Sequence, residues 1–169
     1  MEETGSKVTS HIVKGVFLAI ILIIYSLTGH FTNLLQRDWF FMEGVGIFVA
    51  GVIWSVINYA GQLNGDINFA GLLTYGLKLT AVVTCLMFLY SLVELYVFFP
   101  NYMDEVVKNY VLRAAKGGQF DKDNYNEYKD QARRVLTTMR FAGTVMGTMI
   151  MGLLASLIGG ALAKKNPGA

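Results

Sequence analysis

Three ionisable residues, Glu43, Lys78 and Glu94, lie inside or close to the ends of long apolar stretches of the sequence. A charged side chain costs free energy in an apolar environment, so it either pairs with an opposite charge or binds a proton or an ion. Lys78 and Glu94 cannot neutralise each other within one helix, because their separation corresponds to about 24 Å of helical rise. A partner for either residue must therefore come from elsewhere in the chain.

Two arginines are placed to complete a polar cluster with the two acids. Arg37 precedes one apolar stretch and Arg140 precedes another, and helix geometry puts both at the end of the helices expected for Glu43 and Glu94. We interpret Arg37, Glu43, Glu94 and Arg140 as an interfacial cluster of ion pairs or hydrogen bonds that fastens the helices together. The alternative is a proton- or cation-binding site at Glu94, with a pH-dependent activity that Glu94→Gln would abolish.

Other arrangements that could carry chemistry are absent from the sequence. His11 and His30 lie on either side of one apolar stretch, too far apart to share a metal, and no HExxH, P-loop or GxSxG motif occurs. The single cysteine, Cys85, lies inside an apolar stretch and is interpreted as a packing residue. We therefore expect no catalytic residue, no metal, no cofactor and a protein that is not an enzyme.

The elements that position these residues follow from the composition. Of the 169 residues, 54% are hydrophobic and only 15% are charged, whereas soluble domains are about 25% charged. The apolar residues form four stretches, each long enough to cross a bilayer, which needs about 20 residues. They span residues 12–31, 40–60, 72–99 and 141–163. The sequence predicts an all-α membrane protein with four transmembrane helices in one integral membrane domain, residues 1–169. The net charge of +2 and the lack of a dense basic run argue against nucleic acid as a partner.

A polar segment separates the third apolar stretch from the fourth. Pro100 ends the third stretch, because proline cannot continue a helix without losing a backbone hydrogen bond. Beyond it, Met103, Val107, Tyr110 and Ala114 recur at three- and four-residue steps, which is the spacing of one helical face. A similar pattern follows the Gly117–Gly118 break, and it continues into the fourth stretch. We predict an amphipathic helical hairpin over residues 101–138, outside the membrane.

The last apolar stretch contains two sets of small residues with four-residue spacing, one from Gly143 and one from Gly152, a spacing typical of helices whose backbones approach closely. The residues are Gly143, Gly147, Gly152, Ser156 and Gly160. We interpret them as helix-packing residues within the bundle, with a seam between identical chains as the alternative.

The basic residues give two indications of orientation. Four spans put both termini on one side, where Lys164 and Lys165 directly follow the last span and favour a cytoplasmic location. The 101–138 segment carries more basic residues in total, which favours the opposite orientation. We expect both termini to be cytoplasmic. Lys14, in the first turn of the first span, is expected to extend its side chain toward the lipid headgroups.

The order of these features resembles a bacterial inner-membrane family known only as a four-helix domain of unknown function. The resemblance is carried by INFAGLLTYGLKLT at the start of the third stretch, by FFPNYMDEVVKNY at its end, and by the Gly-rich last stretch that ends in lysines. The segment GQLNGDIN departs from the basic residues usual at that place in the family. The resemblance implies a small integral inner-membrane protein without established catalytic residues.

These observations lead to two hypotheses about function. The first is a non-enzymatic accessory or scaffold subunit in the cell envelope, whose partners are the lipid bilayer and either another protein or further copies of this chain. The alternative is a small transporter or channel that works only as an oligomer, since four spans with few inner polar groups make a poor pore alone.

Overall fold

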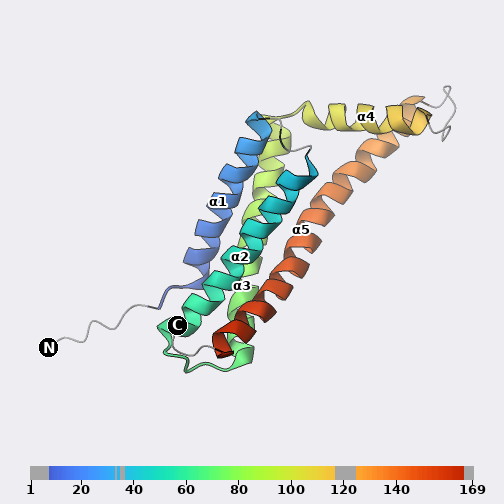
Figure 1. Cartoon of the computed structure of the whole chain (residues 1–169). Helices are drawn as coiled ribbons and strands as arrows, with labels where there is room; N and C mark the ends of the chain where they lie inside the picture. The colour runs from blue at the N-terminus through green and yellow to red at the C-terminus, as the bar shows by residue number, and fades with distance from the viewer. Residues whose placement is uncertain (1–7, 33, 35–36, 117–124, 166–169) are drawn as a thin grey trace. The chain divides into compact units, whose positions relative to one another are not determined.

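The computed structural model describes residues 8–32, 34, 37–116 and 125–165, and everything within them that has regular structure is helical. The helices are α1 (His11–Phe31), α2 (Asp38–Gln62), α3 (Phe69–Val93), the short π-helix η1 (Glu94–Phe98), α4 (Tyr102–Lys116) and α5 (Tyr125–Lys165), shown in Figure 1. Four of the helical segments are long and apolar enough to cross a membrane, namely α1, α2, α3 together with η1, and α5. The predictions of an all-helical fold and of four apolar helices of membrane-spanning length are thus confirmed.

The helices fall into two compact units. The first contains the described residues up to Met87 and from Met146 onward, and the second runs from Phe88 to Val145. Both α3 and α5 contribute to each unit. The 41-residue α5 is one continuous helix, so the second half of the polar segment and the fourth apolar stretch form a single element, as the pattern after the double glycine predicts.

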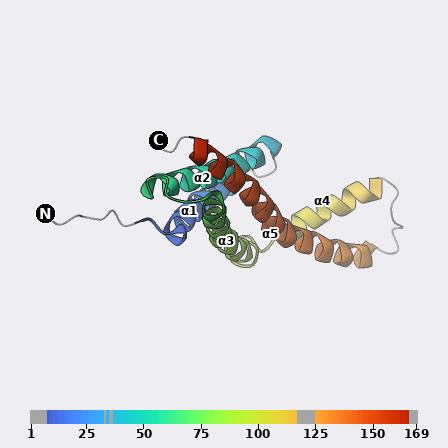
Figure 2. The ribbon, with the colours of Figure 1, turned by 90° about the horizontal axis from the view of Figure 1, so that it is seen from below.

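In the first unit, α1, α2, α3 and the end of α5 lie side by side (Figure 2). They share one apolar core. Its fully buried side chains recur at four- and seven-residue intervals, so each helix contributes one stripe. Examples are Val52 and Val56 of α2, and Leu72, Leu79 and Val83 of α3. The opposite faces expose large apolar side chains, as expected of helices surrounded by lipid.

The end of α2 is fixed by a Schellman motif, in which backbone N–H groups beyond the helix return to its last carbonyls. Gly65 N donates to Ala60 O at 3.0 Å, and Asn64 N donates to Gly61 O at 3.0 Å. Asn64 and Gly65 have φ angles of 51° and 75°, a left-handed conformation that asparagine and glycine tolerate best. The turn holds Gln62, whose side-chain carbonyl accepts a 2.7 Å hydrogen bond from Thr9 N just before α1.

Small residues bring α3 and α5 into close contact within the first unit. Gly76 lies against Ser156, and Gly152 lies against Thr80 so closely that a Cβ at either glycine would overlap its neighbour. One turn from this contact, the hydroxyls of Thr84 and Thr148 are 2.9 Å apart. The spacing of small residues in the last apolar stretch thus coincides with a helix–helix contact.

The other glycines of that pattern differ in how closely they approach the neighbouring helix. A Cβ at Gly160 would lie 3.0 Å from the Phe69 ring, in tight contact with α3. In contrast, a Cβ at Gly143 or Gly147 would meet no atom within 4 Å in the described part of the chain. Gly143 and Gly147 therefore take no part in the packing seen here, and a role for them in contacts with another chain stays a prediction.

The hydroxyl of Thr80 is buried and has no hydrogen-bond partner among the described residues. A buried polar group without a partner costs about 1–3 kcal/mol. Thr80→Val keeps the shape and removes the hydroxyl, so we expect it to leave the free energy of unfolding unchanged or raise it by up to about 1 kcal/mol. Denaturant titration followed by circular dichroism in detergent measures this change.

Thr84→Val is the matched control, and it should be destabilising because it breaks the bond to Thr148. A loss of stability in the Thr80 variant as large as in the Thr84 variant would contradict the expectation.

In the second unit, α4 packs against the first turns of α5 and the end of α3. Met103, Val107 and Val111 of α4 form a buried cluster with Leu95 and Ala132. Met103 and Val107 belong to the apolar face predicted from the sequence, whereas Tyr110 of that face is exposed. At the surface, Arg133 pairs with Asp104 at 3.0 Å, with both side chains about half exposed.

Candidate polar site at the end of α3

The α-helical geometry of α3 changes at Glu94. From Glu94 to Phe98 the chain forms a single π-helical turn, which is closed by a 2.9 Å hydrogen bond from Phe99 N to Glu94 O. Pro100 follows directly and has no N–H with which to continue the helix. Isolated π-helical turns within α-helices are frequent at functional sites. The sequence contained a signal for the end of this helix but none for its widened last turn.

Glu94 forms an ion pair with Arg140 of α5, which joins the two helices within the second unit. Glu94 is 5% exposed, while the Arg140 side chain is 25% exposed. An ion pair shielded from water is favourable only when its geometry is good and its other polar atoms are also bonded, because both charges lose hydration. Two tyrosines supply part of this compensation.

Tyr90 and Tyr102 flank the two members of the ion pair. The Tyr90 hydroxyl donates to Glu94 Oε1 at 3.5 Å, one turn before it on α3. The guanidinium carbon of Arg140 lies 5.2 Å from the ring centroid of Tyr102, a distance at which a cation is attracted by the aromatic face. The site therefore gives the carboxylate one charged and one neutral donor, and it holds the guanidinium between an acid and a ring.

This arrangement can do two things chemically. It can fasten the end of α3 to the middle of α5, because breaking one side of a buried ion pair leaves a charge without compensation. It can also bind and release a proton or a cation at Glu94 if Arg140 moves away. The Glu94 carboxylate is the group of the pair that can take up either. The first use needs only the geometry observed, and the second needs an additional motion.

The other two residues of the predicted cluster lie in the first unit. Arg37 directly precedes α2 and is exposed. Glu43 is exposed, and its Oε2 lies 3.2 Å from the hydroxyl of Tyr25, which donates to Phe40 O at 2.8 Å. Glu94 and Arg140 thus pair with each other, while the contact of this pair with Arg37 and Glu43 stays a prediction. Lys78 is exposed on α3.

Lys14 has contacts that the sequence did not predict. It is 7% exposed and points to α2, where its ammonium donates to Asn58 Oδ1 at 2.6 Å. Sequence reasoning missed this contact because Asn58 lies 44 positions along the chain. The available signal was the polar pair Asn58 and Gln62 at helical spacing near the end of an apolar stretch.

Possible metal ligands do not gather in the described part of the chain, where no three His, Cys, Asp or Glu side chains come together. His11 instead makes an edge-to-face contact with the ring of Tyr75, with centroids 6.2 Å apart. The residues described here thus offer an ion pair and hydrogen-bonded polar clusters.

Four helices of membrane-spanning length and apolarity, with charged residues near their ends, define the class as a multi-pass membrane protein. The comparison with known families then makes the assignment specific. The family described as "Protein of unknown function (DUF4199)" matches residues 12–165, so the chain belongs to this family. No curated protein and no solved structure matches the chain.

Proposed function

We propose that this protein is a non-enzymatic accessory or scaffold subunit of the bacterial inner membrane, with both termini in the cytoplasm. The observation that carries the proposal is the second unit. There, α4 and the first part of α5 share a buried apolar cluster, and we take them to form an amphipathic helical hairpin outside the membrane. Because Val107 and Val111 are already fully buried inside the hairpin, its outer face is available to another molecule.

The outer face of the hairpin combines opposite charges with exposed apolar side chains. On α4 the exposed residues include Glu105, Lys108, Leu112 and Arg113. A helix that lies on a lipid surface typically has a continuous apolar face flanked by basic residues. Interspersed acids, bases and single apolar side chains instead suit the polar rim and small apolar centre of a protein interface. The proposed occupant is therefore another envelope protein.

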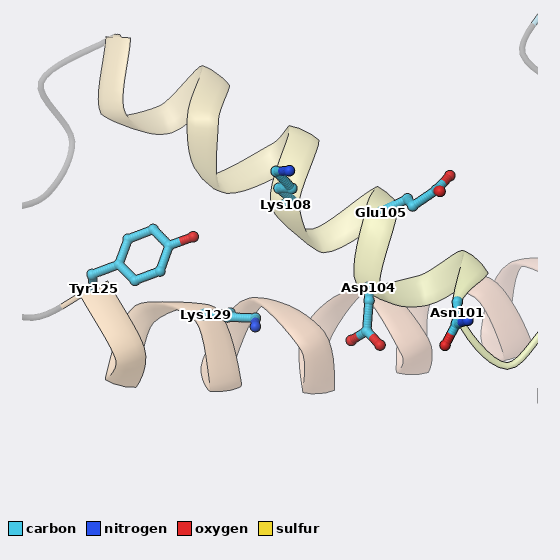
Figure 3. A pocket seen from close by; sticks show the side chains of 6 residues that line it. All are labelled: Asn101, Asp104, Glu105, Lys108, Tyr125 and Lys129. Carbon is cyan, nitrogen blue, oxygen red and sulfur yellow. The ribbon is translucent and has the colours of Figure 1, made fainter.

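A shallow depression lies between α4 and the start of α5 (Figure 3). Its volume is about 260 Å³, and it is lined by Asn101, Asp104, Glu105, Lys108, Tyr125 and Lys129. In Figure 3, Asp104 points toward α5, while Glu105 points away from the gap. The two lysines beside Tyr125 can recognise an acidic partner segment, and the outward-pointing Glu105 adds a site for a basic one.

The proposal is tested by in vivo photo-crosslinking from single positions, followed by mass spectrometry. A crosslinker at Leu112 on the hairpin should capture one envelope protein reproducibly, and Lys108→Glu combined with Arg113→Glu should reduce that yield severalfold. The matched control position is Ile24 on α1, which is similarly exposed but belongs to a candidate span, and it should capture no such partner.

A different outcome would overturn the proposal in favour of the transporter hypothesis. If the crosslinks join only copies of this chain and the purified oligomer passes ions or solutes in liposomes, the scaffold function is wrong. The orientation is tested separately with reporter fusions at Gly118 and at the C-terminus. A cytoplasmic reporter at Gly118 would contradict cytoplasmic termini, because an odd number of spans separates the two positions.

A further inference from the structure

A buried lysine in the first turn of α1 belongs to neither the ion pair at the end of α3 nor the hairpin. The ammonium of Lys14 donates to Asn58 Oδ1 at 2.6 Å and to the backbone carbonyl of Ser55 at 3.3 Å. It also lies 5.7 Å from the ring centroids of Trp54 and Tyr75, in the range of cation–π attraction. All of these contacts lie within the first unit.

The positive charge of Lys14 has no negative partner in the described part of the chain. The ion pairs found there are Glu94 with Arg140 and Asp104 with Arg133, both in the second unit. Neutral acceptors and aromatic rings reduce the cost of burying a cation but leave its charge uncompensated, and that cost is large in an apolar environment. An anion bound next to Lys14 would supply the missing charge.

The groups around Lys14 that remain available are all donors. Lysine only donates, so the Asn58 atom that faces it must be the oxygen, which also accepts from Gln62 Nε2 at 2.8 Å. The Asn58 amide NH₂ has no acceptor among the described residues. The third ammonium hydrogen of Lys14 and the indole N–H of Trp54 likewise have none there. Because Trp54 and Asn58 are four positions apart on α2, their side chains are neighbours on one face.

We propose that Lys14, Asn58 and Trp54 bind the phosphate group of an anionic phospholipid. A phosphate oxyanion accepts hydrogen bonds from all three donors and neutralises the ammonium. A lipid is the proposed source of the phosphate because the approach to the site is apolar. Trp54 is 58% exposed, and Val13 and Phe17 on the neighbouring face of α1 are also exposed.

The position of these residues near helix ends supports the same source. Lys14 lies in the first turn of α1, and Asn58 lies one turn before the end of α2. Tryptophan and lysine near the ends of membrane-spanning helices lie at the level of lipid headgroups. Basic pockets between such helices bind anionic headgroups. The acyl chains would then cover the apolar surface beside the site.

The test uses the purified full-length protein in mixed micelles that contain a neutral detergent and increasing phosphatidylglycerol. Wild-type protein should gain thermal stability with phosphatidylglycerol and should carry the lipid in native mass spectrometry. Phosphatidylcholine, which is zwitterionic, should give a much smaller gain. Lys14→Met should raise the apparent dissociation constant for phosphatidylglycerol about tenfold, the effect of losing one charge-assisted hydrogen bond.

Two further variants keep the proposal open to contradiction if Lys14→Met does not fold. Trp54→Phe keeps the ring and removes only the indole N–H, so it should weaken phosphatidylglycerol binding severalfold without unfolding the protein. Lys78→Met removes an exposed lysine from α3 and should leave binding unchanged. Equal weakening by Lys78→Met, or full binding by both the Lys14 and the Trp54 variants, would overturn the site. An equal gain from inorganic phosphate would overturn the lipid as its source.

Discussion

Replacing Arg140 with methionine should lower the free energy of unfolding by about 3 kcal/mol. The substitution leaves the carboxylate of Glu94 buried without its cation, and breaking one side of a buried ion pair costs about 3–5 kcal/mol. We expect the lower end of that range, because the Arg140 side chain is 25% exposed. Solvent therefore already weakens the attraction between its charge and that of Glu94. Methionine keeps an unbranched apolar side chain beside Tyr102, although it also loses the cation–π attraction between the guanidinium and that ring.

The matched variants complete a double-mutant cycle. Glu94→Leu alone should cost less than Arg140→Met, since a lone Arg140 can turn toward solvent and still contact Tyr102. The double variant Glu94→Leu with Arg140→Met should recover most of the lost stability, because replacing both charges with apolar groups removes the desolvation cost. Reversible unfolding in detergent, followed by circular dichroism at several denaturant concentrations, gives the three free energies.

The cycle also separates the two uses of the site. If the pair only fastens helices, the double variant should retain partner capture by the crosslinker at Leu112. If Glu94 instead serves as a proton or cation site, the stable double variant should lose activity. Additive single-variant effects, with no recovery in the double variant, would contradict direct coupling between Glu94 and Arg140.

The ion pair illustrates what the sequence could predict. Glu94 and Arg140 were grouped because a carboxylate within an apolar stretch needs compensation, and because helix lengths place both residues at one end. The π-helical turn was not predictable, since Glu94–Phe98 has the same apolar composition as the preceding α-helix. Within this turn Leu95 packs against residues of α4 and α5, and such tertiary contacts leave no local pattern in the sequence.

Lys14 shows the opposite case, in which the residue was noticed but its partner on α2 was not predicted. A lysine in the first turn of an apolar helix usually reaches the headgroups, and the sequence around it is compatible with that position. The deciding factor is Asn58 on α2, which offers an acceptor at 2.6 Å. Which faces of two apolar helices meet is only weakly encoded locally, because lipid-facing and core-facing residues are chemically alike.

The stripe of small residues was predictable as a pattern, but its extent was not. Small residues with four-residue spacing occur in two sets, from Gly143 to Gly147 and from Gly152 to Gly160. Of the glycines in these sets, Gly152 and Gly160 lie against α3, whereas a Cβ at Gly143 or Gly147 would meet no atom within 4 Å. Since the same residues can pack against lipid, against a partner or against another helix of the chain, spacing alone cannot choose among them.

Gly152→Ala should therefore destabilise the protein, although alanine is the better helix former. A Cβ at this position would overlap the side chain of Thr80 on α3, and its contact with the Thr80 Cβ would be 2.8 Å. Overpacking of this kind costs about 1–3 kcal/mol, which outweighs the gain of up to about 1 kcal/mol from helix propensity. Because Thr80 is fully buried and β-branched, it cannot rotate away without meeting other atoms.

Gly147→Ala is the matched control on the same helix, where a Cβ would meet no atom within 4 Å. It should leave the free energy of unfolding unchanged or raise it slightly, whereas Gly152→Ala should lower it. Thr80→Ala in the Gly152→Ala background should restore part of the stability, because it deletes both atoms that lie closest to the new Cβ. Equal effects of the two glycine substitutions would show that α3 and α5 do not approach as closely in detergent as they do here. A full rescue by Thr80→Ala would show that the two helices can shift apart enough to absorb the remaining Cβ contact.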